Sequence, residues 1–263
     1  MQVCYTDSML PKVCLVLTEN TIEKDIQLLE RYRQWIDAVE LRADFLNPQE
    51  LLHIRQFPRL ARIPVILTIR RLLDGGTFRG GEGSRITLFA RGLAFADSDP
   101  AHNFAYIDLE ADMEVPSLEE AAQAFNIGII RSFHSIKGPI RDIIVKAKEI
   151  RRTDEEIVKI AYKANTLEDV TALFRQAPKI EGPSTLIAMS KYGIPSRILS
   201  SRLHSSFVYT MPQEYITKAQ MEQEFLDPIT LQTVYRFRSI DDETKIYGVA
   251  GADTSKSLSP SIH

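Results

Sequence analysis

Short apolar runs rich in β-branched residues alternate along the chain with longer amphipathic segments. The runs are typical of buried strands, and the amphipathic segments are typical of helices that cover a sheet. The pattern predicts eight strands, at Lys12–Leu17, Ala38–Leu41, Pro64–Ile69, Ala105–Leu109, Gly128–Ser132, Val158–Tyr162, Thr185–Met189 and Ser206–Tyr209. The helices predicted between them include Thr21–Arg33, Ser84–Ala94, Ser117–Phe125, Ile140–Arg151 and Leu167–Gln176, with start signals at Thr21, Ser117 and Thr166.

The alternation of strands and helices also predicts the architecture. Each connection is long enough to cross over, so consecutive strands are expected to pair in parallel with right-handed connections. Eight such units close into a barrel, and 263 residues are enough for one domain of this kind. We therefore predict an α/β fold, a (β/α)8 TIM barrel, in residues 1–238, followed by a separate segment at residues 239–263.

Polar side chains gather where the predicted strands end, although the strand interiors are mostly Val, Ile, Leu and Ala. In a parallel barrel only the loops after the strands converge on one mouth, so these side chains are expected to meet there. Each residue alone could be a capping or surface group, but the shared position favours a functional site. The residues are Glu40, Arg42, Thr68, Arg70, Asp108, Glu110, His134, Lys163 and Ser190.

Lys163 follows the strand-like run Ile157–Ala161. A lysine in this place is commonly a solvated loop residue. The alternative is a nucleophile that forms a Schiff base with a carbonyl compound, which requires the neutral amine. An ordinary lysine has a pKa of about 10.4, and bringing it near 7 costs about 4 kcal/mol. Partial burial beside Arg42, Arg70 and Arg197 is the expected source of that destabilisation.

His134 lies at the end of the strand that precedes the lysine, in the sequence RSFHS. A single histidine is often a packed or capping residue. Beside an amine nucleophile, however, an imidazole is suited to general acid and base catalysis. A protonated Schiff base would act as the electron sink, so this chemistry requires no metal.

Composition and charge narrow the function classes. Apolar residues make up 44% and charged residues 25% of the chain, with a net charge of −3 and a pI near 6.0. This balance gives no electrostatic footprint for nucleic acid or an anionic membrane. Cys4 and Cys14 form no CxxC motif, which argues against a zinc site or a disulfide framework and favours a reducing compartment, the cytoplasm. No apolar run approaches the length of a membrane span, and Met1–Pro11 lacks the features of a signal peptide.

Six spaced motifs resemble those of the type I 3-dehydroquinate dehydratases of the shikimate pathway, which makes aromatic amino acids. They are VELRAD at 39–44, LTIRR at 67–71, DLE at 108–110, RSFHS at 131–135, KIAYKA at 159–164 and AMSKYGIPSR at 188–197. The resemblance spans roughly residues 12–220. It implies a cofactor-free dehydratase in which Lys163 forms an imine with 3-dehydroquinate, His134 moves protons, and loss of water gives 3-dehydroshikimate.

The same resemblance assigns supporting roles at the substrate. Arg197 is expected to hold the substrate carboxylate, for which a guanidinium fork is well suited. Other positions implied to bind the substrate are Glu40, Arg42, Arg70 and Gln220. Gln220 closes the sequence ITKAQ, in which Ile216 occupies a position where the family usually has serine.

The segment after Arg70 departs from the family pattern. Asp74 stands where a glutamate is common, and either Asp74 or Glu82 is expected to orient His134. The glycine-rich stretch Gly75–Gly83 is either a mobile loop over the mouth or a plain connector, since it lacks the lysine and serine of a phosphate-binding loop.

The last segment, IYGVAGADTSKSLSPSIH at 246–263, is either a tail or part of a second domain. It resembles the opening of shikimate dehydrogenase, whose SLSP motif would supply Ser257 and Ser259 to a shikimate carboxylate. We therefore expect residues 239–263 to be a linker and the opening of a truncated second domain. A covalently linked dehydrogenase, with NADP as its cofactor, is expected only where that domain is present.

Two competing functions remain open from the sequence. A class I aldolase-like barrel would also use an imine-forming lysine but would cleave a carbon–carbon bond. A binding domain of the same fold would bind the substrate without turnover.

Overall fold

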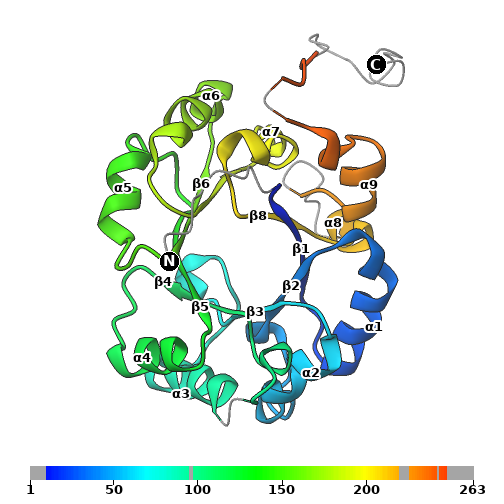
Figure 1. Ribbon diagram of the computed structural model, residues 1–263, viewed down its shortest axis with the longest axis vertical. Helices are drawn as coiled ribbons and strands as arrows, with labels where there is room; N and C mark the ends of the chain where they lie inside the picture. The colour runs from blue at the N-terminus through cyan, green and yellow to red at the C-terminus, as the bar shows by residue number, and fades with distance from the viewer. Residues whose placement is uncertain (1–9, 95–96, 219–224, 242, 248–263) are drawn as a thin grey trace.

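The computed structural model describes residues 10–94, 97–218, 225–241 and 243–247. Eight parallel strands form one sheet in the order β7-β6-β5-β4-β3-β2-β1-β8 (Figure 1). The strands are β1 (Lys12–Leu17), β2 (Ala38–Arg42), β3 (Val65–Thr68), β4 (Tyr106–Glu110), β5 (Gly128–Ser135), β6 (Ile157–Lys163), β7 (Ser184–Met189) and β8 (Phe207–Thr210). Each strand begins within one residue of its predicted start.

The sheet closes between β7 and β8. The backbone N–H of Ser206 donates to the carbonyl oxygen of Ser184 at 2.6 Å, and the N–H of Leu186 donates to the hydroxyl of Ser205 at 3.1 Å. All eight strands therefore surround one interior, which confirms the predicted barrel.

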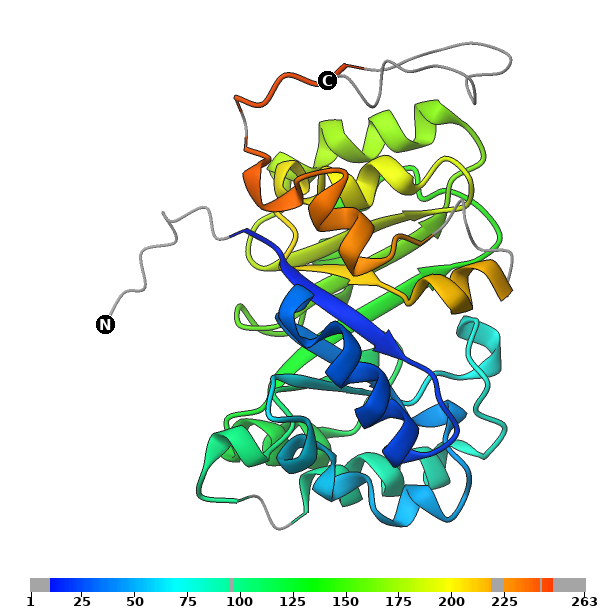
Figure 2. The same cartoon turned by 90° about the vertical axis from the view of Figure 1, so that its right-hand side faces the viewer.

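Helices form a ring outside the strands (Figure 1). They are α1 (Ile22–Tyr32), α2 (Phe57–Ala61), α3 (Glu82–Leu93), α4 (Pro116–Ala124), α5 (Ile143–Ile150), α6 (Leu167–Gln176), α7 (Ile194–Ile198), α8 (Gln213–Lys218) and α9 (Pro228–Thr233). Within the described residues, none of them has the length and apolar content needed to cross a membrane. In the side view, β1 points toward the end of the barrel where α8 lies (Figure 2).

The helix start signals were correct at two of three positions. The side chains of Thr21 and Thr166 cap α1 and α6, and Asp169 completes a capping box with Thr166. The prediction for Ser117 was wrong, because α4 begins at Pro116. Proline is favoured at the first helical position, since its fixed φ suits a helix and no N–H bond is lost there.

Alternate residues of each strand face opposite sides of the sheet. On β6, Val158, Ile160 and Tyr162 pack with the helices outside, whereas Ile157 joins the apolar cluster inside the barrel. That inner cluster also contains Cys14, Val16, Ala38, Ile66, Ile130, Phe207 and Tyr209. Lys159 shares the inward face with Ile157, so its ammonium group is enclosed by the barrel.

Candidate active site

Lys159 is the cation at the centre of the barrel interior. Lys159 is only 5% exposed, and its Nζ donates to Glu40 Oε1 at 3.1 Å and to Asp108 Oδ2 at 3.0 Å. The two acids come from β2 and β4, so three strands meet at one charge. A buried ammonium is costly unless it is paired and hydrogen-bonded, and the carboxylates meet this requirement.

Both acids are held by further partners. The Thr68 hydroxyl donates to Glu40 Oε1 at 2.9 Å, and the Ser132 hydroxyl donates to Asp108 Oδ1 at 2.5 Å. Arg70 forms ion pairs with Asp108 at 2.8 Å and with Glu110 at 2.9 Å. Burial opposes the charge on Asp108, but Arg70 and Lys159 hold the pKa of this carboxyl well below its usual range. Asp108 is therefore an anion at neutral pH.

His134 is on β5, where it lies opposite Ala161 of β6 and two residues after Ser132. Its Nδ1 is buried and has no hydrogen-bond partner within the part of the chain that the structure describes. Burial, together with the positive charges of Arg70 and Lys159, holds the pKa of His134 well below its usual range. The imidazole is therefore neutral at pH 7 and able to accept a proton.

Tyr209 forms the floor beneath the lysine. The Nζ of Lys159 lies 4.0 Å from the centroid of the Tyr209 ring, within the range of a cation–π interaction. Burial raises the pKa of the Tyr209 phenol well above its usual value, so the ring stays uncharged.

A cleft of about 510 Å³ opens beside this cluster. Its lining includes His134, Ser132, Glu110 and Asp74. The imidazole therefore borders a space large enough for a small molecule.

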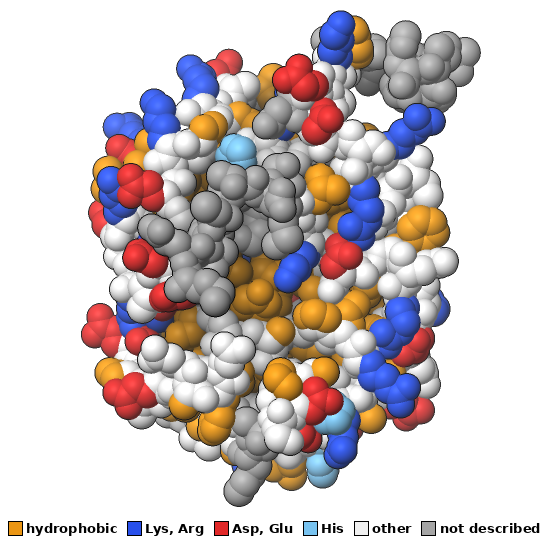
Figure 3. Space-filling view, viewed as in Figure 1, with side chains coloured by type: hydrophobic (Ala, Val, Ile, Leu, Met, Phe, Trp, Pro, Cys, Tyr) orange, Lys and Arg blue, Asp and Glu red, His pale blue; other side chains and the backbone are white. Residues whose placement is uncertain are grey.

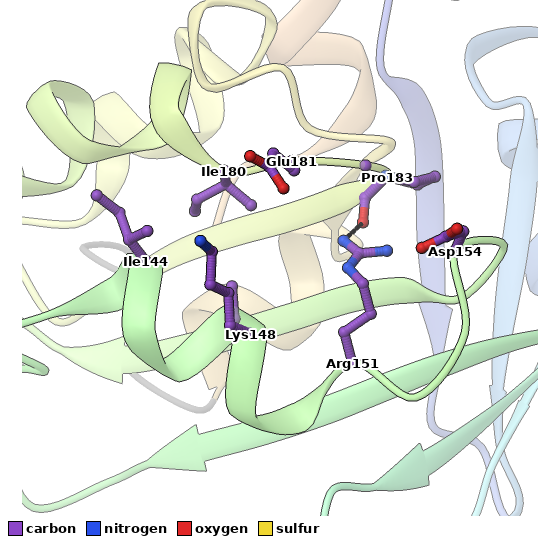
Figure 4. A pocket seen from close by; sticks show the side chains of 9 residues that line it. Ile144, Lys148, Arg151, Asp154, Ile180, Glu181 and Pro183 are labelled. Atoms are coloured by element: carbon purple, nitrogen blue, oxygen red, sulfur yellow. Dashed lines mark hydrogen bonds between the residues drawn. The ribbon is translucent and has the colours of Figure 1, made fainter.

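A smaller hollow of about 260 Å³ lies where β6 and β7 begin (Figure 4). There the Arg151 guanidinium donates to the backbone oxygens of Glu156 and Pro183, each at 2.7 Å. These bonds join two loops at the opposite end of the barrel from His134. Figure 3 views this end, where Lys and Arg side chains are interspersed with Asp and Glu.

The structure brings Glu40, Arg70 and His134 together as the sequence predicted. Arg197, on α7, is buried, donates to the carbonyl oxygen of Ala188 at 3.0 Å and lies over the Phe225 ring. Arg42 forms an ion pair with Asp44 at 2.8 Å, and Asp44 also accepts the backbone N–H of Thr77.

Lys163 does not join the cluster. It is the last residue of β6 and is exposed, so the expectation that it is partly buried beside cations was wrong. It lies four positions after Lys159, which is about 13 Å along a strand. Alternation within the strand puts Lys159 on the inward face between Ile157 and Ala161, which makes it a second candidate beside Lys163.

The two acids proposed to orient His134 have other partners. Asp74 pairs with Arg71 at 2.7 Å, and Glu82 pairs with Arg85 at 2.6 Å. The sequence analysis placed Asp108 among the strand-end residues of the expected site but assigned it no specific task. It gave no site role to Ser132 or Tyr209. Gln220, Ser257 and Ser259 lie outside the described residues, so the predictions for them are not tested.

Comparison with known proteins identifies the family of this chain. Residues 13–242 match the family described as Type I 3-dehydroquinase. A 3-dehydroquinate dehydratase of Methanocaldococcus jannaschii is 30% identical over 192 residues, which are 71% of this chain and 82% of that protein. A bifunctional 3-dehydroquinate dehydratase/shikimate dehydrogenase of Arabidopsis thaliana is 26% identical over 95% of this chain, which spans only 41% of that protein.

A solved structure is also similar in its fold. The type I 3-dehydroquinate dehydratase of Clostridium difficile superposes with a TM-score of 0.72 at 18% sequence identity. The superposition covers 88% of this chain and 94% of that chain. At this level of identity the likeness concerns the barrel alone.

Proposed function

The chain belongs to the type I 3-dehydroquinase family, whose members are hydro-lyases of the shikimate pathway, and we propose that it dehydrates 3-dehydroquinate through an imine on Lys159. One observation carries the assignment to Lys159. Among the residues that the structure describes, it is the lysine enclosed by the barrel beside two carboxylates, with the neutral imidazole of His134 on the adjacent strand. Lys159 replaces Lys163 as the proposed nucleophile.

The reaction begins when Lys159 gives up its ammonium proton. The neutral amine attacks the ketone carbon, and loss of water from the resulting carbinolamine gives a protonated imine. His134 then removes a proton from the carbon beside the iminium, and the electron pair moves onto the nitrogen. Its return expels the β-hydroxyl group, which leaves as water with the proton from His134. Hydrolysis of the iminium releases 3-dehydroshikimate and restores Lys159.

The carboxylates have the same electrostatic role before and after the imine forms. The ammonium of free Lys159 and the protonated imine place a positive charge at the same nitrogen. Glu40 and Asp108, which stabilise the first cation, are therefore already positioned for the second. The iminium is the electron sink, so the proposal involves neither a metal nor a cofactor.

Substrate contacts are assigned to residues at the mouth. We place the substrate carboxylate at Arg197 and its hydroxyl groups near Arg42, with Gln220 as a further contact. The donors of Arg70 already bond Asp108, Glu110 and Ser132. Arg70 therefore organises the acids rather than serving as the main substrate contact. Asp74 remains our candidate for orienting His134 when substrate is bound, because it lines the same cleft.

An ultraviolet assay with two matched lysine variants tests the proposal. The enone product absorbs in the ultraviolet, so turnover of 3-dehydroquinate is expected to raise the absorbance. Lys159→Ala is expected to abolish the rise, because it removes the nucleophile. Lys163→Ala, four residues away on the same strand, is expected to retain most of it. Loss of activity in Lys163→Ala alone would return the assignment to the exposed lysine.

We also propose that residues 239–263 lead into a shikimate dehydrogenase-like domain in a longer protein. The SLSP motif with Ser257 and Ser259 supports this, as does the similarity to a bifunctional plant protein over 95% of the chain. NADP-dependent oxidation of shikimate by the full-length gene product would test it. The two-cysteine composition supports a cytoplasmic setting for the same protein.

A further inference from the structure

We propose that Arg85, on helix α3, is a positioning residue that holds the acids around Lys159 through a chain of buried ion pairs. The inference rests on the proposed role of Lys159 as the imine-forming lysine. Arg85 is 0% exposed, which makes it one of the largest fully buried side chains among the described residues.

The chain of ion pairs alternates in sign from helix α3 to the barrel interior. Arg85 Nη1 pairs with Glu110 Oε2, and the other oxygen of Glu110 accepts from Arg70 Nη1 at 2.9 Å. Arg70 Nη2 continues to Asp108 Oδ2 at 2.8 Å, and Lys159 donates to that same oxygen at 3.0 Å. Four ion pairs thus connect Arg85 to Lys159. Glu110 forms two of them, with Arg85 and Arg70, and Asp108 forms the other two, with Arg70 and Lys159.

Because Arg70 and Lys159 share one oxygen of Asp108, the contact of Lys159 with Asp108 depends on Arg85 at the other end of the ion-pair chain. Glu110 divides its two oxygens between Arg85 and Arg70, so loss of Arg85 leaves Arg70 as its remaining ionic partner among the described residues. Arg70 would then be drawn toward Glu110 and away from Asp108. Asp108 would in turn bind the ammonium of Lys159 more strongly and oppose its deprotonation.

The balance of buried charges also predicts that loss of Arg85 favours the protonated form of Lys159. Arg85, Arg70 and Lys159 are matched by three carboxylates, Glu110, Asp108 and Glu40. Replacing Arg85 by a neutral residue leaves one excess negative charge in a buried region, which favours the protonated lysine. The outer acid, Glu82, has a side chain that is 46% exposed, so solvent screens its effect.

Other ionisable groups also face Lys159 from the surrounding strands. They are Glu40 on β2, Arg70 two residues after β3, Asp108 on β4, His134 on β5, Tyr209 on β8 and Cys14 on β1. Arg85 bonds none of these except through Glu110 and Arg70, while its Nη1 also donates to the carbonyl oxygen of Ile69 at 3.1 Å. A purely structural role would be to hold α3 against the segment that follows β3 through that bond.

The pH dependence of kcat/KM separates positioning from a structural role, because it reports groups of the free enzyme. Arg85→Met is expected to move the acid limb of the profile to higher pH by about one unit. This corresponds to about a tenfold loss at pH 7 that shrinks as the pH rises. Arg85→Lys keeps the charge and is expected to restore the limb. Glu82→Gln, which removes only the exposed partner, is expected to leave it in place.

The shift of the acid limb should disappear when both charges of the Arg85–Glu110 pair are removed. Glu110→Gln alone leaves an excess positive charge and should shift the limb to lower pH, and adding Arg85→Met should return it toward wild type. These two variants also provide the test if Arg85→Met fails to fold. An equal loss at every pH, or an unchanged limb in both single variants, would overturn the inference. Failure of Lys159→Ala to abolish wild-type turnover would instead overturn the proposed function.

Discussion

His134 lies near two cations, Arg70 and Lys159, and this determines its role at the scale of single residues. Their charges and the burial of the ring keep the imidazole neutral, so it can take the proton that the iminium makes acidic. Asp108, close to the same cations, is kept ionised. The two side chains therefore differ in protonation as the proposed chemistry requires, with a neutral base beside a permanent anion.

Replacement of His134 should separate imine formation from proton transfer. We expect His134→Ala to lower kcat by about 10²–10⁴-fold, the usual contribution of a positioned acid–base group. Lys159 should still form the imine, because its amine and the two carboxylates are untouched. If His134→Ala stopped turnover and also formed no imine, His134 would be needed from the first step. The measurement is steady-state turnover beside mass detection of the reduced adduct.

The choice between Lys159 and Lys163 shows what the sequence could predict at this scale. The motif KIAYKA identified the correct strand, but both lysines occupy its inward-facing positions. The sequence analysis chose Lys163 as the nucleophile because it lies at the strand end, where the loops form the mouth of the barrel. The acids of β2 and β4 lie one level lower, beside Lys159. Only the register of the strands reveals that level, and no local pattern encodes the register between β2, β4 and β6.

At the scale of secondary-structure elements, the strands and the longer helices followed from the hydrophobic pattern. Strand β1 and helix α6 have the predicted boundaries, because the apolar periodicity and the Thr166 cap coincide there. The sequence analysis assigned no boundaries to the short helices α2, α7 and α8. They have five or six residues each, and so few residues carry little periodic signal.

Helix α1 contains a buried acid that makes stability depend on pH. Asp25 accepts the backbone N–H of Glu19 at 3.0 Å, and its second oxygen is buried without a hydrogen-bond partner among the described residues. Burial raises the pKa of Asp25 to about 8. The folded protein therefore keeps a proton that the unfolded chain, with a carboxyl pKa of about 3.9, releases.

Asp25→Asn should consequently stabilise the protein more as the pH rises. Proton release by the unfolded chain lowers the wild-type free energy of unfolding between about pH 4 and pH 8. The amide variant lacks this term but keeps an acceptor for the N–H of Glu19. Urea unfolding at pH 5 and pH 8 should show a larger advantage of the variant at pH 8. An advantage that is equal at both values would contradict a raised pKa at Asp25.

At the scale of the whole molecule, the barrel concentrates charges from distant parts of the sequence in one small interior. Lys159 and Glu40 are 119 residues apart in the chain, yet their side chains are hydrogen-bonded. The packed apolar layer beneath them excludes water and strengthens each ion pair. The fold class was predictable because eight repeated units leave few closed topologies. The interior pairing was not predictable, since it depends on strand tilt and stagger around the closed sheet.

The central claim is that Lys159 carries the substrate as an imine. Borohydride reduction in the presence of 3-dehydroquinate converts an imine into a stable amine, and fragment masses between residues 159 and 163 distinguish the two lysines. We predict one substrate-derived mass on Lys159 and an unmodified Lys163. An adduct on Lys163, or an unmodified Lys159 in a preparation that turns over substrate, would contradict the claim.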